Sequence, residues 1–145
     1  MKEESTTGLN NILNSIKKEN MDEYLDKYGE DDKTVISKYF MDNNISISAI
    51  SRTLNGYMSK SYLYDIVNGV KTSPTRDYLI MICIAAQMDR KSIRRVLESY
   101  ELSDLYPKNK RDIIIATNIN NKVYDLDVIN EELVDHGLKP LTKEN

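Results

Sequence analysis

The segment from Ser46 to Arg76 constrains the fold of this chain more than any other, because its signals mark two short helices joined by a tight turn. Apolar residues recur at helical spacing on both sides of that turn: Ile47, Ile50 and Leu54, then Leu63, Ile66 and Val67. Each set forms one face of a helix. Two inward faces in succession predict two helices that pack against a common core.

The turn between these helices is marked by Asn55 and Gly56. They interrupt the first pattern where a tight turn needs a residue that tolerates a positive φ. Ser59 follows, and its hydroxyl can accept a hydrogen bond from the free N–H groups that open the next helix. We therefore expect the second helix to begin directly after Ser59.

The end of the second helix is marked by Gly69, which suits the left-handed position that follows a last helical turn. Ser73 and Pro74 then predict an N-cap and the first residue of a third helix, since proline at that position loses no hydrogen bond. Helix, turn, helix, glycine and restart together indicate a helix-turn-helix.

The rest of the chain shows helical periodicity and no alternating strand pattern of useful length. An amphipathic segment of one or two helices precedes an acidic run at 29–33, and residues 79–86 are apolar almost all round, which predicts the central core helix. We predict an all-α fold: a compact multi-helix bundle containing the helix-turn-helix, with N- and C-terminal helical extensions. The expected parts are 1–31 for the N-terminal extension, 32–104 for the bundle and 105–145 for the C-terminal extension.

Composition places the chain among globular proteins that need no covalent staple. With 145 residues it can bury about 68% of the surface that its unfolded form exposes. One cysteine excludes an internal disulfide framework, and no apolar run approaches the roughly 20 residues of a membrane span. The first residues lack the apolar core of a signal peptide. We expect a cytoplasmic protein with no membrane partner.

Charge is distributed unevenly along the chain, although the net charge is only −3. Residues 1–32 carry a net charge of −5 and residues 112–145 a net charge of −4, whereas residues 44–76 and residues 89–111 each carry +3. A locally basic helix-turn-helix is what attraction to phosphate requires. The alternative is that alternation of this size is an ordinary solvated surface.

Catalysis finds little support in the sequence, and we predict that the protein is not an enzyme and holds no metal or cofactor. One histidine and one cysteine cannot assemble the usual zinc ligand sets. His136 stands before Gly137, where a cation favourably meets a helix C-terminus. Cys83 lies in an apolar stretch, which predicts a buried and inert thiol.

Candidate base contacts are the side chains left outside when the second helix of the motif turns its apolar face inward: Lys60, Ser61 and Tyr64. In helix-turn-helix docking this N-terminal half faces base edges in the major groove. Candidate phosphate contacts flank it on both sides: Ser46, Ser48, Arg52, Lys71, Thr72 and Arg76. The alternatives are that Ser46 or Ser48 only caps a helix and that Tyr62 belongs to the core. Asp65, on or near the same face, would repel phosphate.

Three segments carry a resemblance to a known family: YLYDIVNGVKTSPTRDYLIMICIAAQMD (62–89), LYPKNKRDIIIA (105–116) and YDLDVINEELVDHGLKPL (124–141). They resemble lambda repressor/Cro-like (XRE-type) helix-turn-helix proteins with a helical C-terminal extension, as found in low-GC bacteria. The resemblance spans roughly residues 32–141. In this family the first helix usually has a small residue, and the turn has a glycine four positions later. These two positions correspond here to Thr53 and Tyr57. Gly56 lies one position before the expected glycine, so we expect a reshaped turn.

Two functions follow from these patterns. The first is a transcriptional regulator that reads double-stranded DNA in the major groove as a homodimer, since one such unit reads only half a site. The second is a protein-protein interaction module, an adaptor or a mobile-element-encoded inhibitor, on a helix-turn-helix scaffold. The acidic ends, the displaced glycine and Asp65 favour the second, whereas the local charge and the outward Lys60, Ser61 and Tyr64 favour the first.

Overall fold

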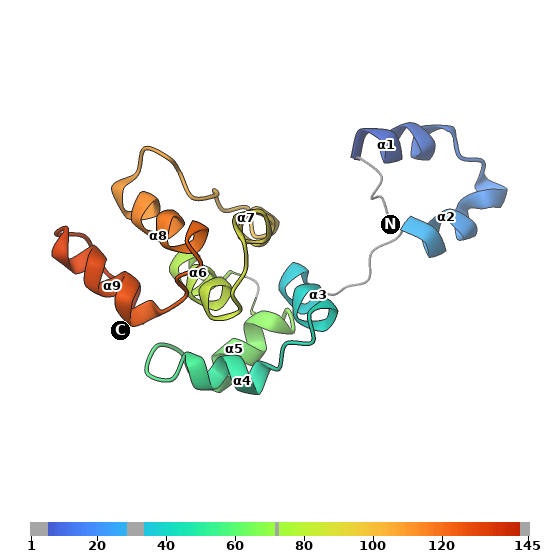
Figure 1. Cartoon of the computed structure of the whole chain (residues 1–145). Helices are drawn as coiled ribbons and strands as arrows, with labels where there is room; N and C mark the ends of the chain where they lie inside the picture. The colour runs from blue at the N-terminus through green and yellow to red at the C-terminus, as the bar shows by residue number, and fades with distance from the viewer. Residues whose placement is uncertain (1–5, 29–33, 72, 143–145) are drawn as a thin grey trace. The chain divides into compact units, whose positions relative to one another are not determined.

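The computed structural model describes residues 6–28, 34–71 and 73–142, and every regular element in these ranges is helical (Figure 1). The all-α prediction is confirmed. The chain divides into two compact units, Met1–Asp32 and Lys33–Asn145, called here the N-terminal unit and the main unit. The acidic run at 29–33 and the expected boundary at residue 31 lie outside the described residues.

The N-terminal unit contains two short helices, as one reading of its apolar pattern predicts. They are α1 (Thr6–Ser15) and α2 (Met21–Tyr28), and the 3-10 turn η1 (Lys18–Asn20) leads directly into α2. In Figure 1 the chain between α1 and α2 forms an open arc. None of the side chains described between residues 7 and 28 is buried, so this unit has no core of its own among them.

The main unit is built around α6, whose residues Leu79 to Ile84 are all buried. This confirms the predicted central core helix. Around it lie α4, α7 and α9, each in contact with α6. The helices of the unit are α3 (Val35–Asp42), α4 (Ile47–Thr53), α5 (Lys60–Val67), α6 (Arg76–Ala85), α7 (Arg90–Ser99), α8 (Lys110–Asn120) and α9 (Leu126–Asp135). Residues 105–145 therefore share one compact unit with the helix-turn-helix.

The start of α6 differs from the prediction. Thr75, in extended conformation, is the N-cap, and its hydroxyl accepts a hydrogen bond from the N–H of Tyr78 at 3.3 Å. The expected cap Ser73 precedes proline, which favours extended backbone, and Pro74 is buried as part of the approach to the helix. The helix thus begins two residues later than predicted, which puts Arg76 and Asp77 in its first turn.

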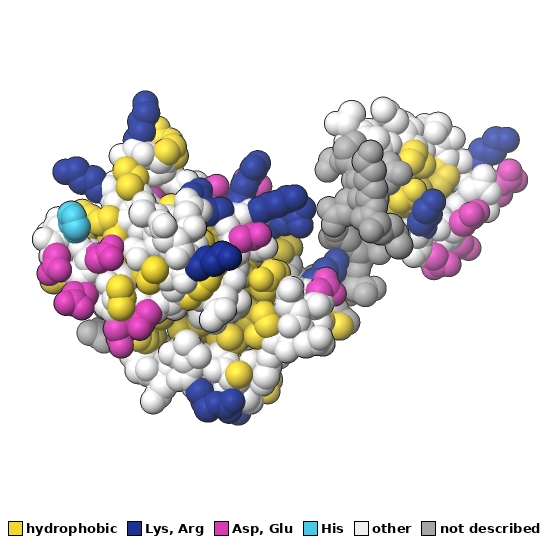
Figure 2. Space-filling model, viewed as in Figure 1, with side chains coloured by type: hydrophobic (Ala, Val, Ile, Leu, Met, Phe, Trp, Pro, Cys, Tyr) yellow, Lys and Arg dark blue, Asp and Glu magenta, His cyan; other side chains and the backbone are white. Residues whose placement is uncertain are grey.

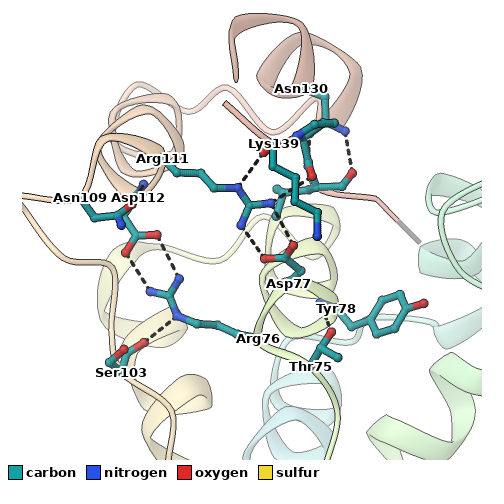
Figure 3. A network of polar contacts seen from close by, with 12 residues as sticks. Thr75, Arg76, Asp77, Tyr78, Ser103, Asn109, Arg111, Asp112, Asn130 and Lys139 are labelled. Atoms are coloured by element: carbon teal, nitrogen blue, oxygen red, sulfur yellow. Dashed lines mark hydrogen bonds and ion pairs between the residues drawn. The ribbon is translucent and has the colours of Figure 1, made fainter. Parts of the chain in front are cut away.

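Two ion pairs join that first turn of α6 to the first turn of α8 (Figure 3). Arg76 binds both carboxylate oxygens of Asp112 at 3.0 Å, and Arg111 binds both oxygens of Asp77 at 2.7 and 2.9 Å. Each helix supplies one arginine and one aspartate, so the charges are reciprocal. Bidentate pairs of this kind are the strongest and most directional ion pairs in proteins. We call these four residues the clasp.

The chain end is tied to the same region. Arg111 also donates to the backbone oxygens of Lys139 and Pro140, at 2.7 and 3.0 Å. The side-chain amide of Asn130 makes two hydrogen bonds to the backbone of Leu141: it accepts from the N–H and donates to the carbonyl oxygen. The Leu141 side chain is fully buried. The C-terminal extension is therefore an integral layer of the main unit.

The single cysteine and the single histidine of the chain both have structural roles. Cys83 is fully buried, and this burial raises the pKa of its thiol, so the thiolate is disfavoured. His136 is the C-cap of α9, and its Nδ1 lies 2.7 Å from the carbonyl oxygen of Glu132. Both placements agree with the predictions from sequence.

Candidate nucleic-acid interface

The first helix of the motif, α4, opens on Ser46. The hydroxyl of Ser46 accepts a hydrogen bond from the N–H of Ala49 at 3.3 Å, so Ser46 caps this helix. Ser46 is also exposed, while Ser48 is half-buried. A capped and exposed helix start still presents backbone N–H groups and a positive dipole end to an anion. The inward face of α4 is anchored by Ile50 and Leu54, both buried.

The turn between α4 and α5 contains Gly56 in a left-handed conformation. Gly56 has φ +89, and the N–H groups of Tyr57 and Met58 both reach the carbonyl oxygen of Leu54. Tyr57 follows this glycine, and its hydroxyl donates a hydrogen bond to Asp127 in the first turn of α9. The turn is therefore fastened to the C-terminal extension through the Tyr57 side chain.

The electrostatic environment keeps this tyrosine a donor. Burial raises the pKa of Tyr57, and the hydrogen bond to Asp127 raises it further. A phenol of raised pKa stays protonated throughout the physiological range. The Tyr57 hydroxyl therefore remains able to donate to Asp127 throughout the physiological range.

The second helix of the motif, α5, separates its faces cleanly. Leu63, Ile66 and Val67 are buried, and the hydroxyl of Ser59 accepts from the N–H of Tyr62 at 3.1 Å, both as predicted. The predicted base contacts all lie on the other side, since Lys60, Ser61 and Tyr64 are exposed. The Lys60 ammonium lies 5.9 Å from the centre of the Tyr64 ring, within range of a cation–π contact.

A second cation–aromatic pair flanks the end of α5. The exposed Lys71 places its ammonium 5.6 Å from the ring centre of Tyr62, and this ring packs on Tyr78 with ring centres 4.9 Å apart. Tyr62 is half-buried and packs against the core, which agrees with the alternative that places this residue in the core. Asp65 is also half-buried, and its carbonyl oxygen accepts from the N–H of Lys71.

The predicted phosphate contacts do not all stay together. Arg52 and Lys71 are exposed beside the motif, whereas Thr72 lies outside the described residues. For Arg76 the prediction is wrong. Its guanidinium is held by Asp112 and also donates to the backbone oxygens of Ser103 and Asp104, at 3.1 and 3.0 Å. These internal acceptors occupy the donors that a phosphate contact would use.

Charge on the surface of the main unit is segregated. Figure 2 shows Lys and Arg side chains at the lower edge of the view, below α4 and α5, and Asp and Glu side chains gathered over α9. On α9 the exposed acids recur at helical spacing: Asp127, Glu131 and Asp135. Arg76 is thus withdrawn from the basic residues around the motif, and the turn of the motif adjoins the acidic residue Asp127.

A shallow cavity of ≈ 450 Å³ lies where the turn meets the C-terminal extension, and Thr53, Tyr57, Gln87, Lys122 and Tyr124 to Asp127 line it. Within the described ranges no group of three or more His, Cys, Asp or Glu side chains is arranged to hold a metal ion. The same ranges contain no helix long and apolar enough to cross a membrane.

Asp77, Asp112 and Asp127 are the residues that sequence reasoning missed. Asp112 and Asp127 bind Arg76 and Tyr57 of the motif, and Asp77 binds Arg111 on α8, with the partners 34 to 70 positions apart in the chain. A local pattern has no signal for such pairs. The N-cap position of Asn109, whose side chain accepts from the N–H of Asp112, marks only the helix start.

Comparison with known proteins adds no assignment, since no family model, no curated protein and no solved structure matches the chain.

Proposed function

We propose that this protein is a DNA-binding transcriptional regulator of the repressor-like, XRE type, which acts in the bacterial cytoplasm and reads the major groove with α5. The observation that carries the proposal is the exposure of Lys60, Ser61 and Tyr64 on the N-terminal half of a helix whose other face is buried. A side chain can read a base edge only if the helix behind it is supported and the side chain itself faces solvent.

The chemistry of these three residues suits base edges. Lys60 can donate to the O6 and N7 acceptors of guanine, and Ser61 can donate to or accept from several bases. Tyr64 is 40% exposed and brings a ring that can lie against a thymine methyl group, together with a hydroxyl that can reach a base or a phosphate. The helix lacks outward Arg, Asn and Gln, so the sequence preference rests on few contacts.

Phosphate contacts would come from both flanks of α5. The opening turn of α4 offers Ser46, Ser48 and its N–H groups, and Lys71 and Arg52 offer charge. These contacts set position along the duplex without reading sequence. One such motif reads half a site, and two half-sites lie about 34 Å apart, so the proposal includes a homodimer.

The second candidate function is a protein-protein interaction module. One observation favours it: the turn of the motif is fastened by Tyr57 to Asp127, so the acidic face of α9 adjoins the basic motif. Phosphate approaching the turn would meet that negative charge. A basic protein segment would be attracted to it instead.

The test is binding of the full chain to random-sequence duplex DNA, measured by fluorescence anisotropy at low and moderate salt. We compare the native protein with Lys60→Ala/Lys71→Ala, which leaves the clasp intact. The matched control is Lys108→Ala/Lys139→Ala, which removes the same charge from exposed positions outside the motif.

The regulator predicts salt-sensitive binding by the native chain and by the control. In Lys60→Ala/Lys71→Ala the slope of log K against log salt falls by about 1 to 2. Equal losses in both variants would show attraction to overall charge and not to the motif. No binding by the folded native chain at low salt contradicts the regulator and favours the interaction module.

A further inference from the structure

The N-terminal unit exposes an apolar surface that its own helices leave uncovered. Ile12 is 37% exposed, Leu13 49%, Met21 47% and Leu25 54%. Ile12 and Leu13 are neighbours in sequence on α1, and Met21 and Leu25 lie one helical turn apart on α2. Figure 2 shows hydrophobic side chains gathered on the surface of this unit. We call these four residues the apolar face.

This face cannot be explained by the stability of the unit alone. Chains of fewer than about 40 residues rarely bury enough surface to stay folded without a disulfide, a metal or a partner chain. The unit contains no cysteine, and none of its described side chains is buried. Its two helices therefore need a partner surface that covers the apolar face.

We infer that the apolar face of the N-terminal unit pairs with the same face of a second copy of this chain and forms the dimer contact. This assignment rests on the proposed function for its purpose, since two half-sites need two copies. The geometry of the contact does not depend on that function, because the apolar face belongs to the N-terminal unit and the proposed DNA-binding motif belongs to the main unit.

Charge argues for a second copy as the partner. In a twofold contact every residue near the axis meets its own counterpart, so a charged residue there meets a like charge. α1 carries no charged residue at all over Thr6–Ser15. It can lie on the axis without repulsion, and its Asn10, Asn11 and Asn14 can hydrogen-bond to their counterparts.

The residues that flank the apolar face carry both signs. Lys17 and Lys18 follow α1, while Asp22, Glu23 and Asp26 lie on α2. Two copies placed about a twofold axis can set the lysines of one against the acids of the other. The acids also disfavour an anionic membrane surface, which amphipathic helices reach through basic flanks.

The apolar face would form the centre of a dimer contact, with polar residues of α1 and α2 around it. A specific interface involves about 20–30 residues on each side. Two helices from each copy would form a four-helix arrangement with a shared apolar core, which is a common way for short amphipathic helices to bury their faces.

The test is sedimentation velocity of the full chain over a range of concentrations. We compare the native protein with Leu13→Gln/Leu25→Gln, which keeps good helix formers, and with the more disruptive Leu13→Glu/Leu25→Glu. The matched control is Val128→Glu/Val134→Glu, which places two charges on apolar residues of α9 that are 40% and 57% exposed. Thermal unfolding of the main unit should be unchanged in the two N-terminal variants.

The inference predicts a concentration-dependent dimer for the native chain and the control. The dimer dissociation constant should rise at least about tenfold in the glutamine variant and at least about 100-fold in the glutamate variant. A native chain that stays monomeric to about 100 µM, or a glutamate variant that still dimerises, overturns it.

Mixing distinguishes a twofold contact from a contact between unlike units. If the N-terminal units pair with each other, tagged Leu13→Glu/Leu25→Glu does not capture the native chain. If the apolar face instead binds the main unit of another copy, the variant still offers its intact main unit, and capture occurs. Capture would contradict the inference.

The outcome also separates this inference from the proposed function. A monomeric glutamate variant that keeps salt-dependent binding to random duplex supports both. Dimerisation without DNA binding supports the interface and contradicts the regulator. DNA binding by a native chain that never dimerises contradicts the interface and supports DNA binding by the motif.

Discussion

Arg76 and Asp112 form a bidentate ion pair at 3.0 Å between the first turns of α6 and α8, and the Asp112 side chain is only 7% exposed. This pair binds the helix that follows the helix-turn-helix to the C-terminal extension. The same carboxylate also accepts from the N–H of Tyr106 at 3.0 Å. Asp112 thus satisfies three donors with one charge and holds the loop before α8 in place.

Replacing Asp112 with asparagine should lower the free energy of unfolding of the main unit by about 2–4 kcal/mol, because it leaves the Arg76 guanidinium partly buried without its counter-charge. Chemical denaturation measures the change. Glu98→Gln is the control, since the Arg94–Glu98 pair is exposed and such surface pairs contribute little to stability. Equal effects of the two substitutions would mean that the clasp contributes no more than a surface pair.

Tyr57→Phe removes only the hydroxyl that donates to Asp127. We expect a loss of about 1 kcal/mol in the free energy of unfolding, since one side-chain hydrogen bond is lost and the ring still packs against the core. Tyr106→Phe, at an exposed tyrosine, should leave stability unchanged. A Tyr57→Phe protein as stable as the native one would show that the turn is not fastened to α9 in solution.

Gly69→Ala should destabilise the main unit by about 1–2 kcal/mol. Gly69 has φ +80, and an added Cβ would lie 3.2 Å from the Cγ2 of Thr34, whose hydroxyl donates to the carbonyl oxygen of Val67. Gly56→Ala is the matched comparison, since φ is +89 there and nothing lies within 4 Å of an added Cβ. The difference between the two losses, from thermal or chemical unfolding, reports the close approach to Thr34. A larger loss of stability in Gly56→Ala than in Gly69→Ala would show that the contact with Thr34 does not determine the cost at Gly69.

Asp89 should make stability depend on acid pH. It caps α7, and the hydrogen bond from the N–H of Ser92 lowers its pKa below 3.8. A carboxylate with a lowered pKa in the folded state stabilises the protein at pH values above its unfolded pKa, and this contribution is lost as pH falls through the folded pKa. Asn can also cap a helix, so Asp89→Asn isolates the charge.

Unfolding of native and Asp89→Asn protein at pH 7 and in steps below pH 4 measures this contribution. The native protein should be the more stable at pH 7, and the difference should shrink as the pH falls below 3.8. A difference that stays constant over this range would show that the charge of Asp89 does not contribute to the cap.

Local signals predicted much of the fold because helix starts and ends depend on neighbouring residues. Ser59 is the N-cap of α5, Gly69 has the positive φ that ends this helix, and residues Leu79–Ile84 lie in the core, all as expected. The cap of α6 was misplaced because Ser73 and Thr75 carry equivalent hydroxyls. Proline between them suits either a first helical residue or an extended approach, and only packing chose the second.

The candidate interface was predicted less completely. Lys60, Ser61 and Tyr64 lie outside because the apolar spacing of α5 determines which side is buried. Arg76 looked equivalent to Lys71 from the sequence, but its partner lies 36 residues away on α8. Whether a basic residue is available to phosphate depends on which carboxylates the fold brings beside it. A local sequence pattern does not show which distant residues become neighbours.

The sequence by itself determined the helices, their inward faces and the side chains exposed on α5, since these follow from periodicity and capping over a few residues. Only the tertiary structure decided that Arg76 joins α6 to α8, that Tyr57 fastens the turn to α9, and that the N-terminal unit leaves its apolar face uncovered. The physical reason is that ion pairs, hydrogen bonds and burial between distant residues depend on how helices pack in space.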